Sequence, residues 1–447
     1  MRARIIGYCI VLLLLLPLWM WLAWFFTPKK QLNALIVDKT VLQYPPQEHE
    51  SLNWVLTNSQ YTRVDGSYYN PSQDYLGFFP LENKKFSIRD LDQLSSGQLE
   101  KMSNELDMAY FTDTYGIYDN DWYGGNRVEI SKKIYGGLSP QDMELMRYMK
   151  AKKKLLISEF NCIASPTSEV VRKEFEALYD IRWTGWTGRY YEQLDTNRTD
   201  QLPGWVTRNY MRDHEGKWPF RGEGLVLVNN NEQVEILEYR SHLNGIAPLI
   251  KSTPAAQKEL RIPAEIRYPF WFEINQTSRL NNVAAVFELN TNDQGDSILN
   301  AHNILRVFPA VIQKKDSGNH MYYFAGDFSD NPIDTRLSHF RGIEYIKSLS
   351  INKRNYGERE SFFYDFYLPM VRSIINRYYE EKHTEKIDQG LKFTMESGSN
   401  DITDFSFRVL NVLNLAFTVF STCWLLLMSI FISFSMIYTC SSDRKFP

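Results

Sequence analysis

Three acidic residues each stand at the end of a short apolar run, at positions where carboxylates can do chemistry. They are Asp38, Asp113 and Glu159. Neighbouring carboxylates can act as general acid and base, or as metal ligands. If the three runs are parallel strands, their ends meet at one edge of a sheet and the acids line one crevice there. The alternative is that each acid caps the next helix or holds a turn.

An aromatic segment is the second candidate for chemistry. Trp183 and Trp186 lie three residues apart, each followed by Thr-Gly, and Arg189 comes directly after them. Aromatic faces and a guanidinium group together can stack on and hydrogen-bond to sugar rings. The alternative is a packed aromatic turn between two lobes. Tyr115, which begins another aromatic stretch, allows the same two interpretations.

Cys162 is the cysteine that lies in the middle of the chain, next to Asn161. A nucleophilic thiol needs a cation or a helix N-terminus to lower its pKa. The sequence identifies no basic partner for Cys162, so a small buried residue is favoured, while Asn161 is grouped with the strand-end acids as a binding residue. The histidines are scattered, which gives no support to a zinc site. Asp327, with Asp330 and Asp334 nearby, offers too few regularly spaced oxygen ligands for a calcium loop, so a turn is favoured there. We therefore predict no metal and no cofactor.

Alternating strand and helix patterns must position these residues. Buried strands are predicted at 33–37, 108–112 and 155–160, and helices follow them. This alternation over residues 31–180 predicts an α/β domain with a mostly parallel, doubly wound sheet. The predicted helices are 48–57, 95–108, 139–149 and 165–179.

The pattern of predicted secondary structure changes after residue 180. Residues 181–383 hold a series of strand-like runs and a terminal helix at 361–382. This β-rich region either completes the first sheet or forms a second lobe. Residues 384–408 are polar and contain Gly and Ser, which predicts a tether.

The order strand, Asp113-Thr-Tyr-Gly116, helix, strand, Glu159-Phe-Asn161, helix resembles the flavodoxin-like layout of class I glutamine amidotransferase-like domains. Active members of that family carry a glycine-flanked nucleophilic cysteine and a later His-Glu pair. Here Cys162 has no flanking glycine, and His214 directly precedes a glutamate without a strand to place it. The resemblance therefore implies a degenerate, non-catalytic member, and membrane-tethered versions of that kind occur in bacterial envelope proteins.

Two apolar runs without charged residues lie near the two ends, at 5–26 and 409–438. A run of 22 residues spans about 33 Å as a helix, enough for a hydrocarbon core of about 30 Å. The first run is too long for the apolar part of a cleaved signal peptide, so a retained signal anchor is favoured. Both runs are predicted to be transmembrane helices.

The charges flanking these runs predict the topology. Arg2, Arg4, Arg444 and Lys445 lie on the side of the termini, which the positive-inside rule places in the cytoplasm. Residues 28–408 are then extracytoplasmic. The formal net charge is −3, with 50 Lys+Arg against 53 Asp+Glu, so nothing indicates a nucleic-acid partner. The predicted partners are the membrane, other envelope membrane proteins and a glycan.

Two functions remain open at this point. The missing catalytic motifs favour a membrane-anchored accessory protein of the cell envelope, whose outer domain binds a glycan or a partner protein in polysaccharide assembly or export. The alternative is an envelope hydrolase that acts on polysaccharide through a carboxylate pair such as Asp113 and Glu159. Two carboxyl groups about 5–10 Å apart in an open, aromatic-walled cleft would favour the hydrolase.

Overall fold

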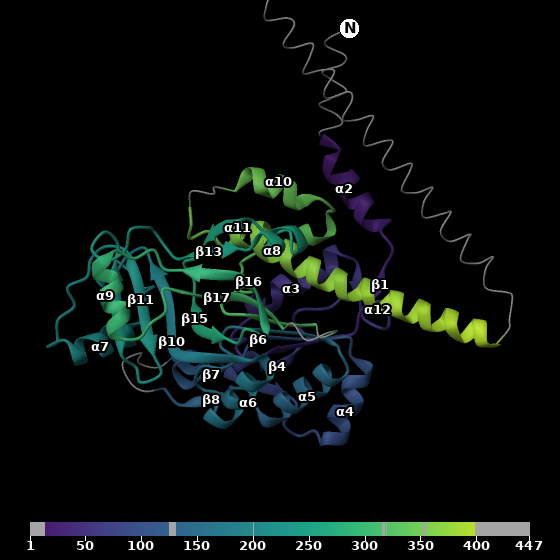
Figure 1. Cartoon of the computed structure of the whole chain (residues 1–447), viewed down its shortest axis with the longest axis horizontal. Coiled ribbons are helices and arrows are strands. Elements are labelled where there is room, and N and C mark those ends of the chain that lie inside the picture. Colours follow the sequence, from purple (N-terminus) through teal and green to yellow (C-terminus); the bar gives the residue numbers. More distant parts are fainter. Residues whose placement is uncertain are drawn as a thin grey trace, which may run out of the picture. The chain divides into compact units, whose positions relative to one another are not determined.

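Four apolar runs form the middle of a mixed sheet, which has ten strands among the described residues (Figure 1). They are β2 (Ala34–Asp38), β6 (Met108–Asp113), β9 (Leu155–Glu159) and β18 (Met321–Phe324), and neighbours among them run parallel. Nearly every residue in these strands is buried, as is usual for parallel strands covered on both faces. The predicted buried strands are thus confirmed.

The parallel strands follow a flavodoxin-like order. With β4 (Leu76–Pro80) they lie as β4-β2-β6-β9-β18, which is chain order 2-1-3-4-5. The sequence did not predict β4, which lies within a stretch rich in Tyr and Gly. Gly77 in β4 has φ +150°, and a Cβ there would lie 1.6 Å from the carbonyl oxygen of Asp38, so only glycine lets β4 pair with β2.

Helices cover both faces of the parallel part. Figure 1 shows α4, α5 and α6 along one face, with α3 and the first part of α12 along the other. Ser139 and Asp142 form a capping box at the start of α5, and the Ser168 side chain accepts from the amide of Val171 at the start of α6. These helices are α3 (Gln47–Asn58), α4 (Ser96–Glu105), α5 (Pro140–Ala151), α6 (Glu169–Tyr179) and α12 (Leu368–Ser397).

The β-rich region contributes strands to two sheets. Part of it extends the first sheet beyond β18 with antiparallel strands, and part forms a second, antiparallel sheet in the order β12-β11-β10-β15. The first sheet therefore crosses the boundary expected at residue 180. The strands that it adds beyond β18 are β17 (Val307–Lys314), β16 (Asn281–Glu288), β13 (Leu249–Ser252) and β14 (Glu265–Arg267). β5 (Phe86–Arg89), which belongs to the first region, forms the opposite edge of this sheet. The second sheet comprises β10 (Ile181–Tyr191), β11 (Gly224–Asn229), β12 (Val234–Glu238) and β15 (Phe272–Thr277).

The other elements of the described chain are short. The strands are β1 (Lys30–Gln31), β3 (Tyr61–Thr62), β7 (Ile117–Tyr118) and β8 (Lys133–Tyr135). The helices are α2 (Leu16–Phe25), η1 (Glu82–Lys84), η2 (Asn120–Gly124), α7 (Gly204–Asp213), α8 (Pro254–Glu259), α9 (Asp293–Ala301), η3 (Thr335–His339), α10 (Ile343–Ser350), α11 (Arg359–Phe362) and η4 (Phe363–Tyr367).

This computed structural model describes residues 14–124, 131–199, 201–314, 318, 320–351 and 355–397. One compact unit ends at Tyr379 and a second begins at Glu380. The predicted tether is wrong as far as Ser397, because α12 continues to that residue through a stretch rich in the helix formers Glu and Lys. The second predicted span, 409–438, lies outside the described residues.

The described part of the first apolar run contains α2, whose helix starts at Leu16. Across all the residues that the structure describes, no helix is both long enough and apolar enough to cross a membrane.

Candidate functional site

Asp113 and Asn161 meet at the carboxyl edge of the parallel sheet, as the strand order predicts. The Asn161 side chain donates to Asp113 Oδ2 at 3.2 Å, and the Tyr115 amide donates to Asp113 Oδ1 at 2.6 Å. Asn161 has φ +66°, a left-handed conformation that asparagine tolerates. Burial, reinforced by the charge of Asp38, raises the pKa of Asp113 to about 7.

Asp38 lies at the same edge but is closed to ligands. Its side chain is fully buried, Oδ1 accepts from the Thr40 amide at 3.0 Å, and Oδ2 lies 2.6 Å from Nδ1 of His49. The other ring nitrogen of His49 lies 2.7 Å from the Pro71 carbonyl oxygen. Asp38 therefore fixes the start of α3, and its predicted role as a binding residue is corrected to a structural one.

The Glu159 side chain is also inaccessible to ligands. Its side chain is fully buried, and Oε2 accepts from the amides of Phe328 at 3.1 Å and Ser329 at 3.0 Å. The hydroxyl group of Tyr110 donates to Oε1. Burial raises the pKa of Glu159 to about 8. Glu159 thus ties β9 to β6 and to the turn after β18, so the predicted carboxylate pair of Asp113 and Glu159 is not open to a substrate.

A cluster of acids lies at the same edge, in which Glu48, which the sequence did not identify, joins Asp327 and Asp330. Oxygen atoms of Glu48, Asp327 and Asp330 all lie within 4.8 Å of one another, and the three side chains are partly exposed. The Arg359 guanidinium pairs with Asp327 at 3.1 Å and Asp330 at 3.0 Å, and it covers the Phe270 ring. These three acids are oxygen ligands that could hold a divalent cation, but Arg359 already supplies positive charge there.

The rim of this edge carries neutral polar groups and a tyrosine ring. Tyr115 is 41% exposed, and its ring lies 5.1 Å from that of Tyr118. The Gly116 amide donates to Thr40 Oγ1 at 3.0 Å, which holds the two loops together. The carboxyl-edge site is defined here as the exposed or partly exposed residues Thr40, Glu48, Tyr115, Asn161, Asp327 and Asp330, together with Asp113, which is buried beneath them.

Burial also raises the pKa of a carboxyl group just behind this site, to about 7. This group is Glu273 of β15, which accepts from the Asn161 amide at 3.2 Å and from the Tyr323 hydroxyl. It connects the second sheet to the turn after β9. No signal in the sequence marked Glu273, because it lies inside a strand and its partners are far away along the chain.

The Trp183–Arg189 segment lies elsewhere, in β10 of the second sheet. Trp183 and Trp186 are 9% and 5% exposed, so little of either ring is open to a ligand. The Trp183 indole donates to the Trp186 carbonyl at 3.0 Å. Arg189 lies over the rings of Tyr191 and Trp271. The expected sugar-stacking surface is therefore wrong, and the packed alternative holds, in a strand rather than a turn.

Cys162 is fully buried in the core. Burial raises the pKa of its thiol, and the nearby charges of Glu273 and Asp113 raise it further. A thiol in this environment is a poor nucleophile. The structure thus supports the interpretation of Cys162 as a small buried residue.

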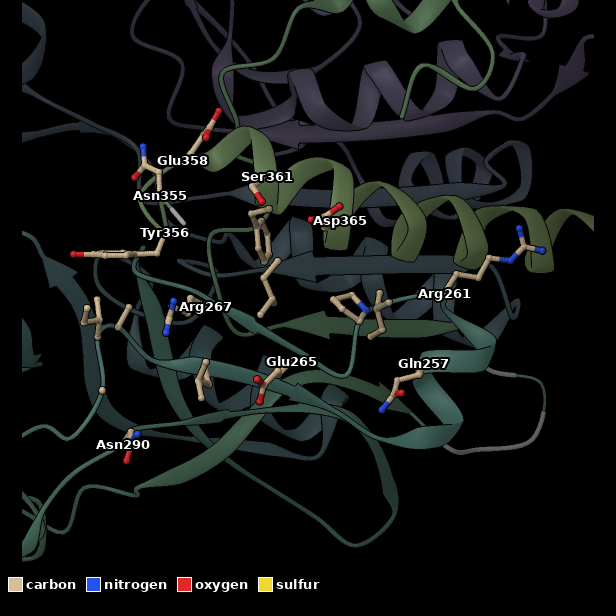
Figure 2. Close-up of a pocket in the computed structure, with 18 residues that line it drawn as sticks. Gln257, Arg261, Glu265, Arg267, Asn290, Asn355, Tyr356, Glu358, Ser361 and Asp365 are labelled. Carbon is tan, nitrogen blue, oxygen red and sulfur yellow. The ribbon is translucent and has the colours of Figure 1, made fainter. Parts of the chain in front are cut away.

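A separate cavity of about 790 Å³ is lined by none of the carboxyl-edge residues (Figure 2). Figure 2 shows Glu265 and Arg267 of β14 on one side and Tyr356, Ser361 and Asp365 on the other. The lining mixes both signs of charge with amides and apolar groups, so it specifies no single class of ligand. No pattern in the sequence indicated this cavity.

Comparisons with known proteins add little. Neither a protein-family profile nor a curated protein matches the chain. Among solved structures, a glutamine amidotransferase from Thermotoga maritima is similar at 8% identity and TM-score 0.33, over 78% of this chain and 98% of that one. A ThuA-like protein from Bacteroides uniformis is similar at 9% identity and TM-score 0.30, over 77% and 93%. A carbohydrate deacetylase is similar at 10% identity and TM-score 0.25, over 70% and 32%. These are distant likenesses of fold, and nothing about activity follows from them.

Proposed function

We propose that the protein is a membrane-anchored accessory protein of the cell envelope that binds a glycan at the carboxyl-edge site and does not cleave it. One observation carries this proposal: loops after β2, β6, β9 and β18 gather carboxylate, amide and hydroxyl groups beside an exposed tyrosine ring. A hydroxyl-rich ligand needs such a mixture of hydrogen-bonding partners and a flat apolar face.

The state of the candidate catalytic groups supports binding over catalysis. Cys162 is buried, and Glu159 has all its contacts inside the protein. Asp327 and Asp330 are engaged by Arg359. Both carboxyl groups therefore already have a partner inside the protein.

The anchoring part of the proposal rests on the sequence. The runs 5–26 and 409–438 contain no charged residue, and basic residues lie between each run and the nearer end of the chain. We propose a two-pass protein with both termini in the cytoplasm and the carboxyl-edge site outside it.

A polysaccharide hydrolase is the second candidate, favoured by one observation. Burial, with the charges of Asp330 and Asp327, raises the pKa of Glu48, so this carboxyl group keeps its proton to a higher pH than an exposed glutamate does, beside the carboxyl groups of Asp327 and Asp330. Such a pair can serve as general acid and base or nucleophile. Release of reducing ends from a polysaccharide by the wild type, and its loss in Glu48→Gln, would favour the hydrolase over the binding protein.

Glycan binding is tested with Tyr115→Ala in the full-length protein in detergent micelles, on an array of neutral and acidic oligosaccharides. We expect the wild type to bind at least one oligosaccharide and the variant to bind it about tenfold more weakly, because one stacked ring contributes about 1.5 kcal/mol. Tyr345→Ala is the matched control, since Tyr345 is an exposed tyrosine on α10. Equal binding by all three proteins, or binding by none, contradicts the proposal.

A further inference from the structure

α10 has its charged side turned inward and its apolar side turned outward. Glu344 pairs with Arg372 at 2.7 Å, and Lys347 pairs with Glu360 at 2.6 Å. All four side chains are at least partly buried. The outward residues are large and apolar: Tyr345 is 74% exposed, Ile346 39% and Leu349 88%.

This orientation is the reverse of an ordinary surface helix. Helices on water-soluble domains bury the apolar side and expose the charged one. A group of large apolar side chains left on the surface marks a contact with something other than water. The elements next to α10 indicate what this apolar side contacts.

α2 is hydrogen-bonded to the segment that leads into α10, and it also carries large exposed apolar side chains. The Arg341 amide, two residues before α10, donates to the Met20 carbonyl at 3.1 Å, and the Arg341 side chain donates to Thr27 Oγ1 at 2.7 Å. Figure 1 shows both helices on the same side of the molecule. The exposed large apolar residues of the described part of the first run are Leu14, Leu15, Leu16, Leu18, Trp19, Trp21, Phe25 and Phe26.

The end of α2 is held firmly against the domain, which fixes the depth of α10. The Trp24 indole donates to the Thr57 carbonyl at 2.9 Å, and its ring lies 4.6 Å from that of His339. Met20, which contacts Arg341, lies six residues before the end of the apolar run at Phe26, or about 9 Å along a helix. Helices that lie in a membrane interface bury their apolar side by about 5–10 Å.

We infer that Tyr345, Ile346 and Leu349 of α10 insert into the lipid bilayer surface beside the anchor, so that the domain lies against the membrane in a fixed orientation. This inference rests on the membrane anchoring of the proposed function. A water-filled gap at this depth would leave three large apolar side chains hydrated next to lipid. The insertion holds the domain through two contacts, the anchor and α10.

The test places a nitroxide spin label at Leu349→Cys in the full-length protein. Cys9, Cys423 and Cys440 are replaced by alanine, and Cys162 stays because it is fully buried. The protein is reconstituted in vesicles of phosphatidylcholine and phosphatidylglycerol. Collisions with oxygen, which concentrates in lipid, are compared with collisions with a water-soluble nickel chelate. Val170→Cys is the matched control, because Val170 is a 70% exposed apolar residue on α6.

We expect the oxygen-to-nickel collision ratio to be about fivefold higher at Leu349 than at Val170. A label at Trp19→Cys separates the two claims. If Trp19 reports lipid while Leu349 matches Val170, the anchor stands and the insertion of α10 is wrong. If Trp19 itself reports water, the anchoring fails and the insertion fails with it. A label at Leu349 that is shielded from both reagents indicates a covering protein and also overturns the inference.

Discussion

Replacing Glu159 by alanine is expected to lower the free energy of unfolding by about 4 kcal/mol at neutral pH. The change leaves the buried amides of Phe328 and Ser329 and the Tyr110 hydroxyl without their acceptor. It also opens a cavity between β9 and the turn after β18. Urea unfolding of the full-length protein, followed by tryptophan fluorescence, measures the loss.

Glu159→Gln is the control that separates hydrogen bonding from charge. Its amide oxygen can accept from Phe328 and Ser329, and its amino group can donate to Tyr110, so this variant should fold. Because burial raises the pKa of Glu159 from 4.5 to about 8, the folded protein keeps a proton that the unfolded chain releases between those values. Wild-type stability therefore falls as pH rises across that window, and Glu159→Gln should show a smaller fall. Equal pH slopes, or an alanine variant as stable as wild type, would contradict this role.

Replacing Arg359 by methionine is expected to cost about 3–5 kcal/mol at neutral pH, because Asp327 and Asp330 lose their cation in a largely buried setting. Methionine keeps apolar contact with the Phe270 ring, so the loss reports charge more than packing. Burial and the charge of Asp330 raise the pKa of Asp327, while Arg359 lowers it. Without Arg359 the folded state takes up a proton more readily, so the deficit should shrink toward pH 5.

Arg306→Met provides the comparison for Arg359→Met. Arg306 pairs with Asp296 at 3.4 Å on the surface, and such pairs contribute at most about 1 kcal/mol. Three carboxylates without a cation should also bind calcium, so millimolar calcium is expected to raise the thermal midpoint of Arg359→Met more than that of Arg306→Met. If the two variants lose equal stability at neutral pH, the cluster is not held together by Arg359.

The parallel core could be predicted from the sequence because its signals are local. β2, β6 and β9 are continuous apolar runs, and an acid follows each as the chain leaves the sheet. Parallel strands must bring those ends to one edge, which is why Asp113 and Asn161 meet. The pattern could not show which of these acids remain accessible to a ligand. Asp38 and Glu159 are closed by His49 and by the turn after β18, which are contacts made only in the folded chain.

The remaining features depend on partners far away in the sequence. The fifth parallel strand, β18, joins β9 across more than 160 residues, and Arg359 pairs with Asp327 across 32 residues. Trp183 and Trp186 look like a binding surface in the sequence, but both rings are buried in β10. Strict alternation would place residues three apart on opposite faces of the strand, and the pairing of β10 with β15 has a register irregularity between Trp183 and Thr187 that breaks this alternation. Aromatic residues are suited to either role, so only their burial decides between them.

Hydrogen–deuterium exchange of the full-length protein, with and without an oligosaccharide that it binds on the array, tests the proposed glycan site most directly. We expect slower exchange on binding in the loops 38–48, 113–118 and 325–331, which carry the carboxyl-edge site. Unchanged exchange in those loops, with slowing confined to residues 245–267 and 355–365 around the separate cavity, would contradict the proposed location of the glycan.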